Sequence, residues 1–369
     1  MTKNNRQSNL GMGVYLPEKV LDNDELERRQ ITLPSGKKLL AKQILDKIGV
    51  ERRHIAGDKQ TVADMGYEAA KTSLRGSGRV DLILTSSSHP TLFHVAEEIK
   101  KRLGLRVQTN EIAASAAQGG LLAMTEVLDI HAACSGSALL FSYLLEKQNE
   151  LQGKKVLLVA TEKFSDSIVD LRHRDAMKLD SSLGQTIFGD GAAAVCFTAG
   201  QDMVIHYALN KVLPDLSGKK DLILMAMGEN KFVEPCVVRP VATSEKLKDF
   251  PKGYFTQNGP RVFEDVQNII PGLIREAVDK AGFKPTDIDL VVIHSGSKRV
   301  VDALRLKLSP DFEVYSDYKD GNMSSVSLLY SFIKAVQEGR IGSGSKVVLC
   351  GFGAGSPDLY SSTVVVELK

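Results

Sequence analysis

The sequence has little of what would place the protein with nucleic acid, in a membrane or in a secretory pathway. Its 369 residues carry a formal net charge of only +2, so bulk charge indicates neither nucleic acid nor anionic lipid as a partner. No apolar run is long enough to span a bilayer, and the polar start of the chain lacks the apolar region of a signal peptide. We therefore expect a cytoplasmic protein with no nucleic acid or membrane partner.

Cysteine is also scarce. The four cysteines, at positions 134, 196, 236 and 350, lie far apart and form no CxxC pair. This spacing argues against a zinc site and against a disulfide framework, and it is typical of a reducing compartment. We expect no metal and no redox cofactor.

Short, apolar, non-alternating segments alternate with helical patterns along the chain. Such strands are buried on both faces, in parallel sheets that helices cover. The clearest examples are residues 80–85, 156–160, 289–293 and 346–350. The sequence therefore predicts an α/β protein.

The strands also repeat. The sequence around residues 80–84 matches that around 288–292, and residues 155–159 match 346–350. The chain is thus expected to be two copies of one α/β half, an N-terminal half at 1–200 and a C-terminal half at 201–369. The first copy has about 17 more residues between its landmarks, and the Ala-, Gly- and Gln-rich stretch 105–124 is the expected place for them.

The strongest chemical signal lies between Leu128 and Tyr143. An apolar strand stops at Cys134, small residues follow, and an amphipathic helix begins. Cys134 is therefore expected in a tight turn at a helix N-terminus, where free N–H groups and the helix dipole favour an anion. A thiol there is biased toward the nucleophilic thiolate. The alternative is a buried cysteine in an apolar core.

Two polar residues of the second half occupy comparable places. His294 ends a buried strand, and Asn322 lies at a strand-to-helix turn. If the halves pack face to face, both converge with Cys134 in one cleft. A thiolate can form an acyl-enzyme from a thioester, and a neutral His and an Asn amide can donate to a developing enolate oxygen. The alternatives are a structural histidine and a turn asparagine.

Residues 351–355, with the sequence GFGAG, are expected to form a glycine-rich turn. The final strand follows it rather than a helix, so it does not open a nucleotide-binding unit. The turn could instead place a backbone N–H beside that of Cys134, against the oxyanion of a tetrahedral intermediate.

Several motifs together resemble the thiolase-fold condensing enzymes, closest to 3-oxoacyl-[acyl-carrier-protein] synthase III, over nearly the whole chain. The matching segments are residues 11–18, 48–56, 129–136, 188–192 and 321–322. Other segments look more like type III polyketide synthases, namely residues 180–194, 294–296, 320–325 and 351–355. The resemblance implies a thiolase-like duplicated αβαβα layered fold with two mixed, mostly parallel sheets.

The resemblance also implies roles for single residues. The nucleophile would be Cys134, with His294 and Asn322 serving decarboxylation and enolate binding. The oxyanion hole would be formed by the N–H groups of Cys134 and Ala354. Substrate-binding positions of the family match Lys47, Phe93 and Arg299.

Substrates and partners follow from the same resemblance. Acyl-CoA, acyl carrier protein or both would supply the thioester through CoA or phosphopantetheine, and the protein would be a homodimer. Phe93 would reach into the partner subunit's acyl pocket. We further expect the stretch 105–124 to be ordered at the subunit interface and to set which acyl groups fit.

The sequence departs from the family at the nucleotide end of the CoA site. The Trp and Arg that usually hold the nucleotide align with Gln43 and Lys47, and another Arg of that site aligns near Ser182. The usual His-Gln-Ala-Asn is His-Ser-Gly-Ser, beginning at His294. These departures weaken the expected grip on CoA and leave a carrier-bound donor open.

The expected function is that of an acyltransferase. It would form an acyl-Cys intermediate and catalyse decarboxylative Claisen condensation with a malonyl-type thioester, in fatty-acid or polyketide biosynthesis. One alternative is non-decarboxylating acyl transfer to an amine, an alcohol or another carbon nucleophile. Another is a non-catalytic partner subunit of such an enzyme.

Overall fold

A computed structural model gives the fold, and it describes ten stretches of the chain. They are residues 8–30, 37–74, 79–88, 93–105, 125–166, 184–213, 223–226, 254–257, 259–354 and 359–369. The predicted extra stretch 105–124 lies outside the described residues except for Leu105. Within the described residues, no helix combines the length and apolar character needed to cross a membrane.

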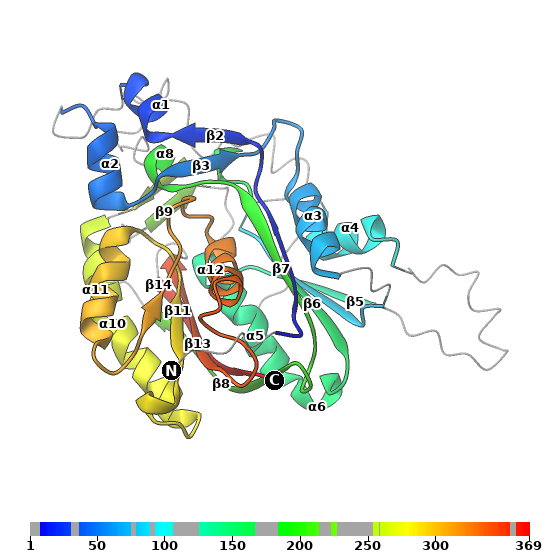
Figure 1. Ribbon diagram of the computed structural model, residues 1–369. Coiled ribbons are helices and arrows are strands. Elements are labelled where there is room, and N and C mark those ends of the chain that lie inside the picture. The colour runs from blue at the N-terminus through cyan, green and yellow to red at the C-terminus, as the bar shows by residue number, and fades with distance from the viewer. Residues whose placement is uncertain are drawn as a thin grey trace.

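The first half of the chain folds around a five-stranded sheet in the order β1-β7-β6-β4-β5 (Figure 1). Only β7 runs against the others, because β4, β5 and β6 are mutually parallel and β1 and β6 both pair with β7 in antiparallel register. The strands are β1 (Gly11–Tyr15), β4 (Leu82–Ser86), β5 (Glu126–Ile130), β6 (Lys155–Glu162) and β7 (Gly191–Thr198).

The second sheet repeats this plan in the order β12-β11-β13-β14-β8. Its single opposed strand is β14, which occupies the place of β7. The strands are β8 (Met203–Leu213), β11 (Leu290–Ile293), β12 (Val314–Tyr315), β13 (Lys346–Ala354) and β14 (Leu359–Leu368). The repeat expected from the sequence is confirmed, because its landmarks fall on β4 and β11 and on β6 and β13.

Helices form three layers around the two sheets. The outer layers are α3 (Val62–Leu74) with α4 (Val95–Arg102) on the first sheet, and α10 (Gly259–Lys280) with α11 (Lys298–Leu308) on the second. Between the sheets lie α5 (Gly136–Glu146) and α12 (Ser325–Gln337), which contact strands of both (Figure 1). The expected layered αβαβα fold with two mixed, mostly parallel sheets is confirmed.

Smaller elements complete the described fold. A cap beside the sheets contains β2 (Lys19–Asp22), α1 (Asn23–Arg28), α2 (Ala41–Ile48) and β3 (Arg52–Ile55). The strands β9 (Ile223–Ala226) and β10 (Tyr254–Gln257) form an antiparallel pair. Short helical turns are η3 (Ala133–Ser135), α6 (Gln148–Leu151), η4 (Phe164–Asp166), α8 (Gly184–Ile187) and η7 (Pro285–Asp287).

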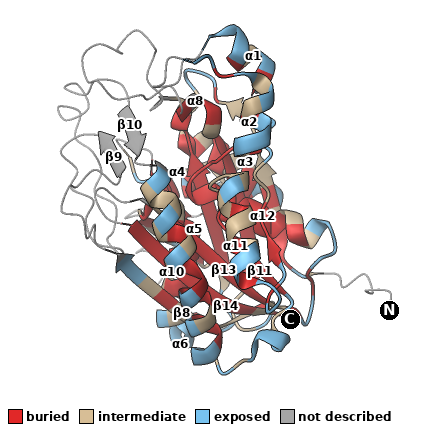
Figure 2. Ribbon diagram, turned by 90° about the vertical axis from the view of Figure 1, so that its left-hand side faces the viewer, coloured by how far each residue is buried: buried red, intermediate tan, exposed pale blue. Residues whose placement is uncertain are grey.

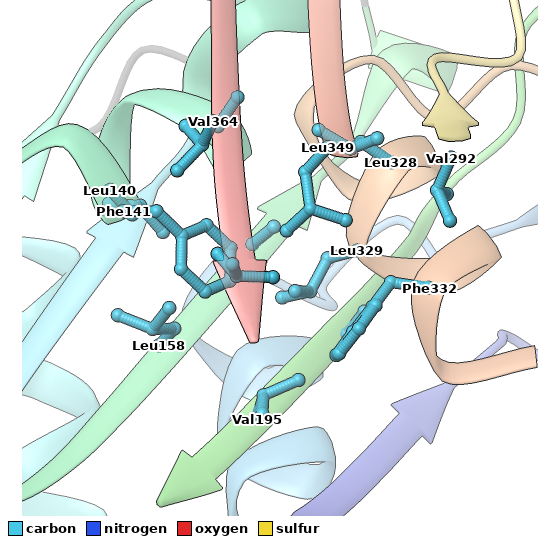
Figure 3. Packing of buried hydrophobic residues seen from close by; sticks show 14 of the residues in the cluster. Leu140, Phe141, Leu158, Val195, Val292, Leu328, Leu329, Phe332, Leu349 and Val364 are labelled. Carbon is cyan, nitrogen blue, oxygen red and sulfur yellow. The ribbon is translucent and has the colours of Figure 1, made fainter. Parts of the chain in front are cut away.

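The main core lies between the sheets, around the two central helices (Figures 2 and 3). Most side chains of α5 and α12 are buried, as expected of helices enclosed on all sides. Phe141 of α5 and Phe332 of α12 are fully buried in the same cluster as Leu158, Leu329 and Leu349. Burial of this apolar surface on both faces of each helix fixes the sheets to the central layer.

One sequence expectation on local structure is wrong. Residues 351–354 continue β13 instead of forming a turn, because the strand keeps its pairing with β14 up to Ala354. The helix α10 continues through Pro271, and residues on both sides of the proline, Ile270 and Ile274, are buried in the outer core of the second sheet. Tertiary packing of an amphipathic helix can outweigh the lost hydrogen bond.

The central layer can be tested with one pair of matched substitutions. Leu329 of α12 is 1% exposed, and Leu306 of α11 is 79% exposed. We expect Leu329→Ala to lower the free energy of unfolding by about 2–5 kcal/mol, because it leaves a cavity between the sheets. Leu306→Ala should change it by less than about 0.5 kcal/mol. Urea unfolding measures both, and equal effects would contradict the assigned core.

Candidate active site

Cys134 lies in the turn that joins the first sheet to the central layer. The strand β5 ends at Ile130, the turn η3 spans Ala133–Ser135, and α5 begins at the next residue. The predicted strand-to-helix turn at a helix N-terminus is therefore confirmed. Ala133 has φ +43°, a conformation that residues with a Cβ rarely adopt and that is enriched at functional sites.

Two glycines of β13 bring the second sheet against this turn. A Cβ on Gly353 would lie 2.4 Å from Cys134 Cβ and 2.9 Å from its Sγ. A Cβ on Gly351 would lie 2.9 Å from Ser135 Cα. The glycines expected to form a turn thus allow a close approach of the strand to Cys134.

His294 directly follows β11, as expected, and is buried. Its backbone N–H donates to the Cys350 carbonyl (2.9 Å), and its ring packs edge-on against Phe352 at 5.5 Å between centroids. Burial lowers the pKa of His294 to about 3, so the imidazole is neutral near pH 7. Its Nδ1 has no hydrogen-bond partner among the described residues. A neutral, buried ring with an unpaired nitrogen is suited to hydrogen bonding with a ligand.

Asn322 lies in a turn that is held by backbone contacts with the first half. Its N–H donates to the Ile187 carbonyl (2.7 Å), and its carbonyl accepts from Gly189 N–H (3.1 Å). Gly321 has φ +89°, which favours glycine there. The Asn322 Oδ1 accepts from Ser324 N–H (2.8 Å), which leaves the NH₂ end as the donor that could meet a substrate oxygen.

A buried carboxylate anchors the same turn. Asp320 accepts from the Tyr330 hydroxyl (2.6 Å) and forms an ion pair with Arg52 Nε (2.6 Å). Burial opposes ionisation of Asp320, but His54, Tyr330 and the Arg52 charge together lower its pKa to about 2. The carboxylate therefore stays charged near pH 7 and ties the Asn322 turn to the cap.

The candidate residues converge on Cys134 through their neighbours. The turn η3, which contains Cys134, contacts α12, the helix that begins just after Asn322. Gly353 abuts the same side chain, and the residue before it, Phe352, contacts the ring of His294. The structure thus brings Cys134 against the Asn322 turn and against the strand segment beside His294.

The expected bias of Cys134 toward thiolate is wrong for the protein without substrate. Burial raises the pKa of Cys134 to about 12, and the charge of Glu162 raises it further, although the Ser324 hydrogen bond acts in the opposite direction. Desolvation of the anion outweighs the favourable position at the helix N-terminus. Cys134 is therefore a thiol near pH 7 and must lose its proton when it reacts.

The expected substrate-binding residues lie farther out. Lys47 of α2 and Arg299 of α11 are exposed on two helices that contact each other, and the Arg299 guanidinium stacks over Phe263 at 4.3 Å. Phe93 is half-buried and packs against the outer core of the first sheet. Ala354 is the last residue of β13, one position beyond Gly353. Ser182 lies outside the described residues.

Sequence reasoning missed two residues of the site, Ser324 and Glu162. Glu162 ends β6, another polar residue at the end of an apolar strand, as His294 is at the end of β11. This pattern, which Glu162 shares with His294, could have identified Glu162 from the sequence. Ser324 has φ +49°, which no local sequence feature predicts. No group of three or more potential metal-ligating side chains occurs within the described stretches.

Comparison with known proteins defines the class. Residues 128–211 match the family described as 3-oxoacyl-[acyl-carrier-protein (ACP)] synthase III, and residues 278–363 match its C-terminal part. The β-ketoacyl-[acyl-carrier-protein] synthase III of Chelativorans sp. (strain BNC1) is 30% identical over 360 residues, 94% of this chain and 95% of that protein. That of Listeria innocua is 29% identical over 357 residues, with the same coverage.

Solved structures agree. The 3-oxoacyl-[acyl-carrier-protein] synthase III of Aquifex aeolicus VF5 has a TM-score of 0.71 at 25% identity, covering 97% of this chain and 98% of that one. The priming β-ketosynthase of the R1128 polyketide pathway has the same fold, with a TM-score of 0.73 at 22% identity over 99% and 97%. The fold and its layers are those of thiolase-like condensing enzymes. Within that class, the chain belongs to the 3-oxoacyl-[acyl-carrier-protein] synthase III family.

The close approach of Gly353 to Cys134 can be tested directly. In Gly353→Ala the new methyl group would overlap the Cys134 side chain and displace it, and small displacements at a reacting centre cost about 100-fold. We expect acylation of Cys134 by a thioester, followed by intact mass, to slow by about that factor. Gly272→Ala is the control, because a Cβ there meets nothing within 4 Å. Equal rates in both variants would contradict the assigned contact.

Proposed function

We propose that the protein is an acyltransferase that forms an acyl-Cys134 intermediate and then condenses it, with decarboxylation, with a malonyl-type thioester. The observation that carries the proposal is the close approach of Gly353 to the Cys134 side chain, which places the proposed nucleophile against the half of the chain that carries His294 and Asn322. Membership of a family of condensing enzymes supports the same reaction.

In the first step, Cys134 Sγ attacks the thioester carbonyl and loses its proton. The C–S bond to the donor breaks, and the departing CoA or carrier thiolate takes up a proton, so the products are acyl-Cys134 and a free thiol. The backbone N–H groups of Cys134 and Ala354 are the proposed donors to the oxyanion of the tetrahedral intermediate.

In the second step, a malonyl-type thioester loses CO₂ and becomes an enolate. Negative charge develops on its thioester oxygen, where His294 and the Asn322 amide are the proposed donors. The low pKa of His294 keeps it a neutral donor near pH 7. The enolate carbon attacks the acyl carbonyl, the C–S bond to Cys134 breaks, and the released thiolate takes up a proton.

The donor is proposed to be acyl-CoA, an acyl carrier protein, or both. The exposed basic groups of Lys47 and Arg299, on contacting helices, suit the phosphates of a pantetheine arm. The condensation product would serve fatty-acid or polyketide biosynthesis.

A homodimer is part of the proposal. Among the described strands, β5 pairs only with β4 and ends the first sheet at the edge next to Cys134. Sheet edges are normally covered or paired. A second copy of the chain at this edge would also bring the partner close to Phe93, which packs against the same sheet.

The two steps can be separated in one variant. We expect Asn322→Ala to be acylated on Cys134 at a near-normal rate but to release CO₂ from a malonyl thioester about 10²–10³ times more slowly, because it lacks one donor to the enolate oxygen. Intact mass follows the first step and trapped ¹⁴CO₂ the second. Asn268→Ala, on the exposed face of α10, is the control. Normal CO₂ release by Asn322→Ala would contradict the role of Asn322 as a donor to the enolate, and a wild type that is acylated but releases no CO₂ would favour non-decarboxylating transfer instead.

A further inference from the structure

Glu162 is a fully buried carboxylate at the end of β6, close to the site but not used by the proposed reaction steps. Both of its oxygens accept from the Ser88 N–H, at 2.9 and 2.8 Å. Its Oε1 also accepts from the Ser325 hydroxyl at 2.7 Å. Burial of a charge lowers the stability of the fold unless hydrogen-bond partners compensate it, so the buried Glu162 carboxylate depends on these contacts.

Glu162 and its two partners come from three separate segments. Ser88 follows β4, Glu162 ends β6, and Ser325 is the first residue of α12, in the opposite half. A carboxylate at the N-terminus of α12 is also favoured by the helix dipole. Glu162 therefore joins the first sheet to the start of α12, a helix that is far from β4 and β6 along the chain.

This junction lies directly behind the nucleophile. Ser324 precedes Ser325, and its hydroxyl lies 3.4 Å from that of Ser88. The helix α12, which follows Ser324, contacts the turn η3 that contains Cys134. The Ser324 backbone N–H donates to Asn322. Ser324 has φ +49°, a conformation that persists only where neighbouring contacts hold it. The Glu162 contacts on each side, at Ser88 and Ser325, are suited to hold it.

We propose that Glu162 is a positioning residue whose carboxylate holds the first turn of α12 against the Ser88 segment, so that Ser324 and Asn322 keep their places at Cys134. The proposal rests on the proposed function, because the step it supports is the decarboxylation assigned to Asn322. The field of Glu162 at the Cys134 thiol shows that the carboxylate is within electrostatic reach of the reacting sulfur.

Two substitutions remove the junction in different ways. Glu162→Gln keeps the size of the side chain but removes its charge and one of its two acceptor oxygens, so Ser88 and Ser325 would share one neutral, weaker acceptor. Ser325→Ala keeps the carboxylate and removes its contact with α12, together with a longer hydrogen bond from the same hydroxyl to the Ser86 carbonyl (3.3 Å). Ser331→Ala is the matched control, on the same helix, where the hydroxyl accepts from Asp317 N–H instead. Ser325→Ala keeps the test open if Glu162→Gln does not fold.

Hydrogen exchange of the full-length protein gives a readout that does not depend on activity. In Glu162→Gln and Ser325→Ala we expect the amides of residues 322–330 to exchange about tenfold faster or more, because the first turn of α12 loses an anchor. The α3 residues 62–74 should be unchanged in both, and Ser331→Ala should leave residues 322–330 near wild type. Unchanged exchange in both test variants would overturn the proposal.

The second readout compares the two chemical steps, with intact mass for acylation by an acyl-CoA and CO₂ release from malonyl-CoA. We expect both test variants to lose about tenfold or more in CO₂ release and less than about threefold in acylation. Equal loss in both steps, or none, would show a purely structural role and overturn the proposal. If the wild type is acylated but releases no CO₂, the proposed function fails, and the exchange result alone decides whether Glu162 holds the turn.

Discussion

At Cys134 the two halves of the chain pack so closely that glycines of β13 lie directly against the cysteine and its neighbour. The strand β13 passes so close to the turn before α5 that a methyl group on Gly353 would overlap the cysteine. That approach needs the two sheets at a fixed spacing, which the buried helices α5 and α12 provide by filling the space between them (Figure 3). The position of Cys134 therefore depends on the layered fold, and the glycines of β13 are part of the candidate site.

The same enclosure sets the charge state of the site. Burial raises the pKa of Cys134 and lowers that of His294, so both groups are neutral near pH 7. Two buried carboxylates lie beside this centre. Asp320, next to the Asn322 turn, accepts from Tyr330, and Glu162 accepts from Ser325, the residue after Ser324. Neutral Cys134 and His294 are consistent with a reaction in which negative charge develops only after the substrate has bound. Hydrogen-bond donors at fixed positions stabilise such a charge most.

The sequence predicted the duplication, the layers and the turn of Cys134 correctly, because apolar strands, landmark repeats and a strand-to-helix switch are local patterns. It also placed His294 after β11 and Asn322 in a turn. The predictions from sequence failed where contacts between segments distant along the chain determine the local structure. Residues 351–354 contain glycines yet stay in β13, because β14 pairs with them. The thiolate bias expected at a helix N-terminus is outweighed by burial, which depends on the opposite half of the chain. The contacts of Glu162 with Ser88 and Ser325 join segments that no local pattern relates.

The account depends on Cys134 being the residue that carries the acyl group. The most direct measurement is the intact mass of the protein after incubation with a panel of acyl-CoA and acyl-carrier thioesters, followed by peptide mapping. The account predicts a gain of one acyl group per chain, located on the peptide that contains Cys134 and absent in Cys134→Ala. Acylation that persists in that variant, on Cys196, Cys236 or Cys350, would contradict it.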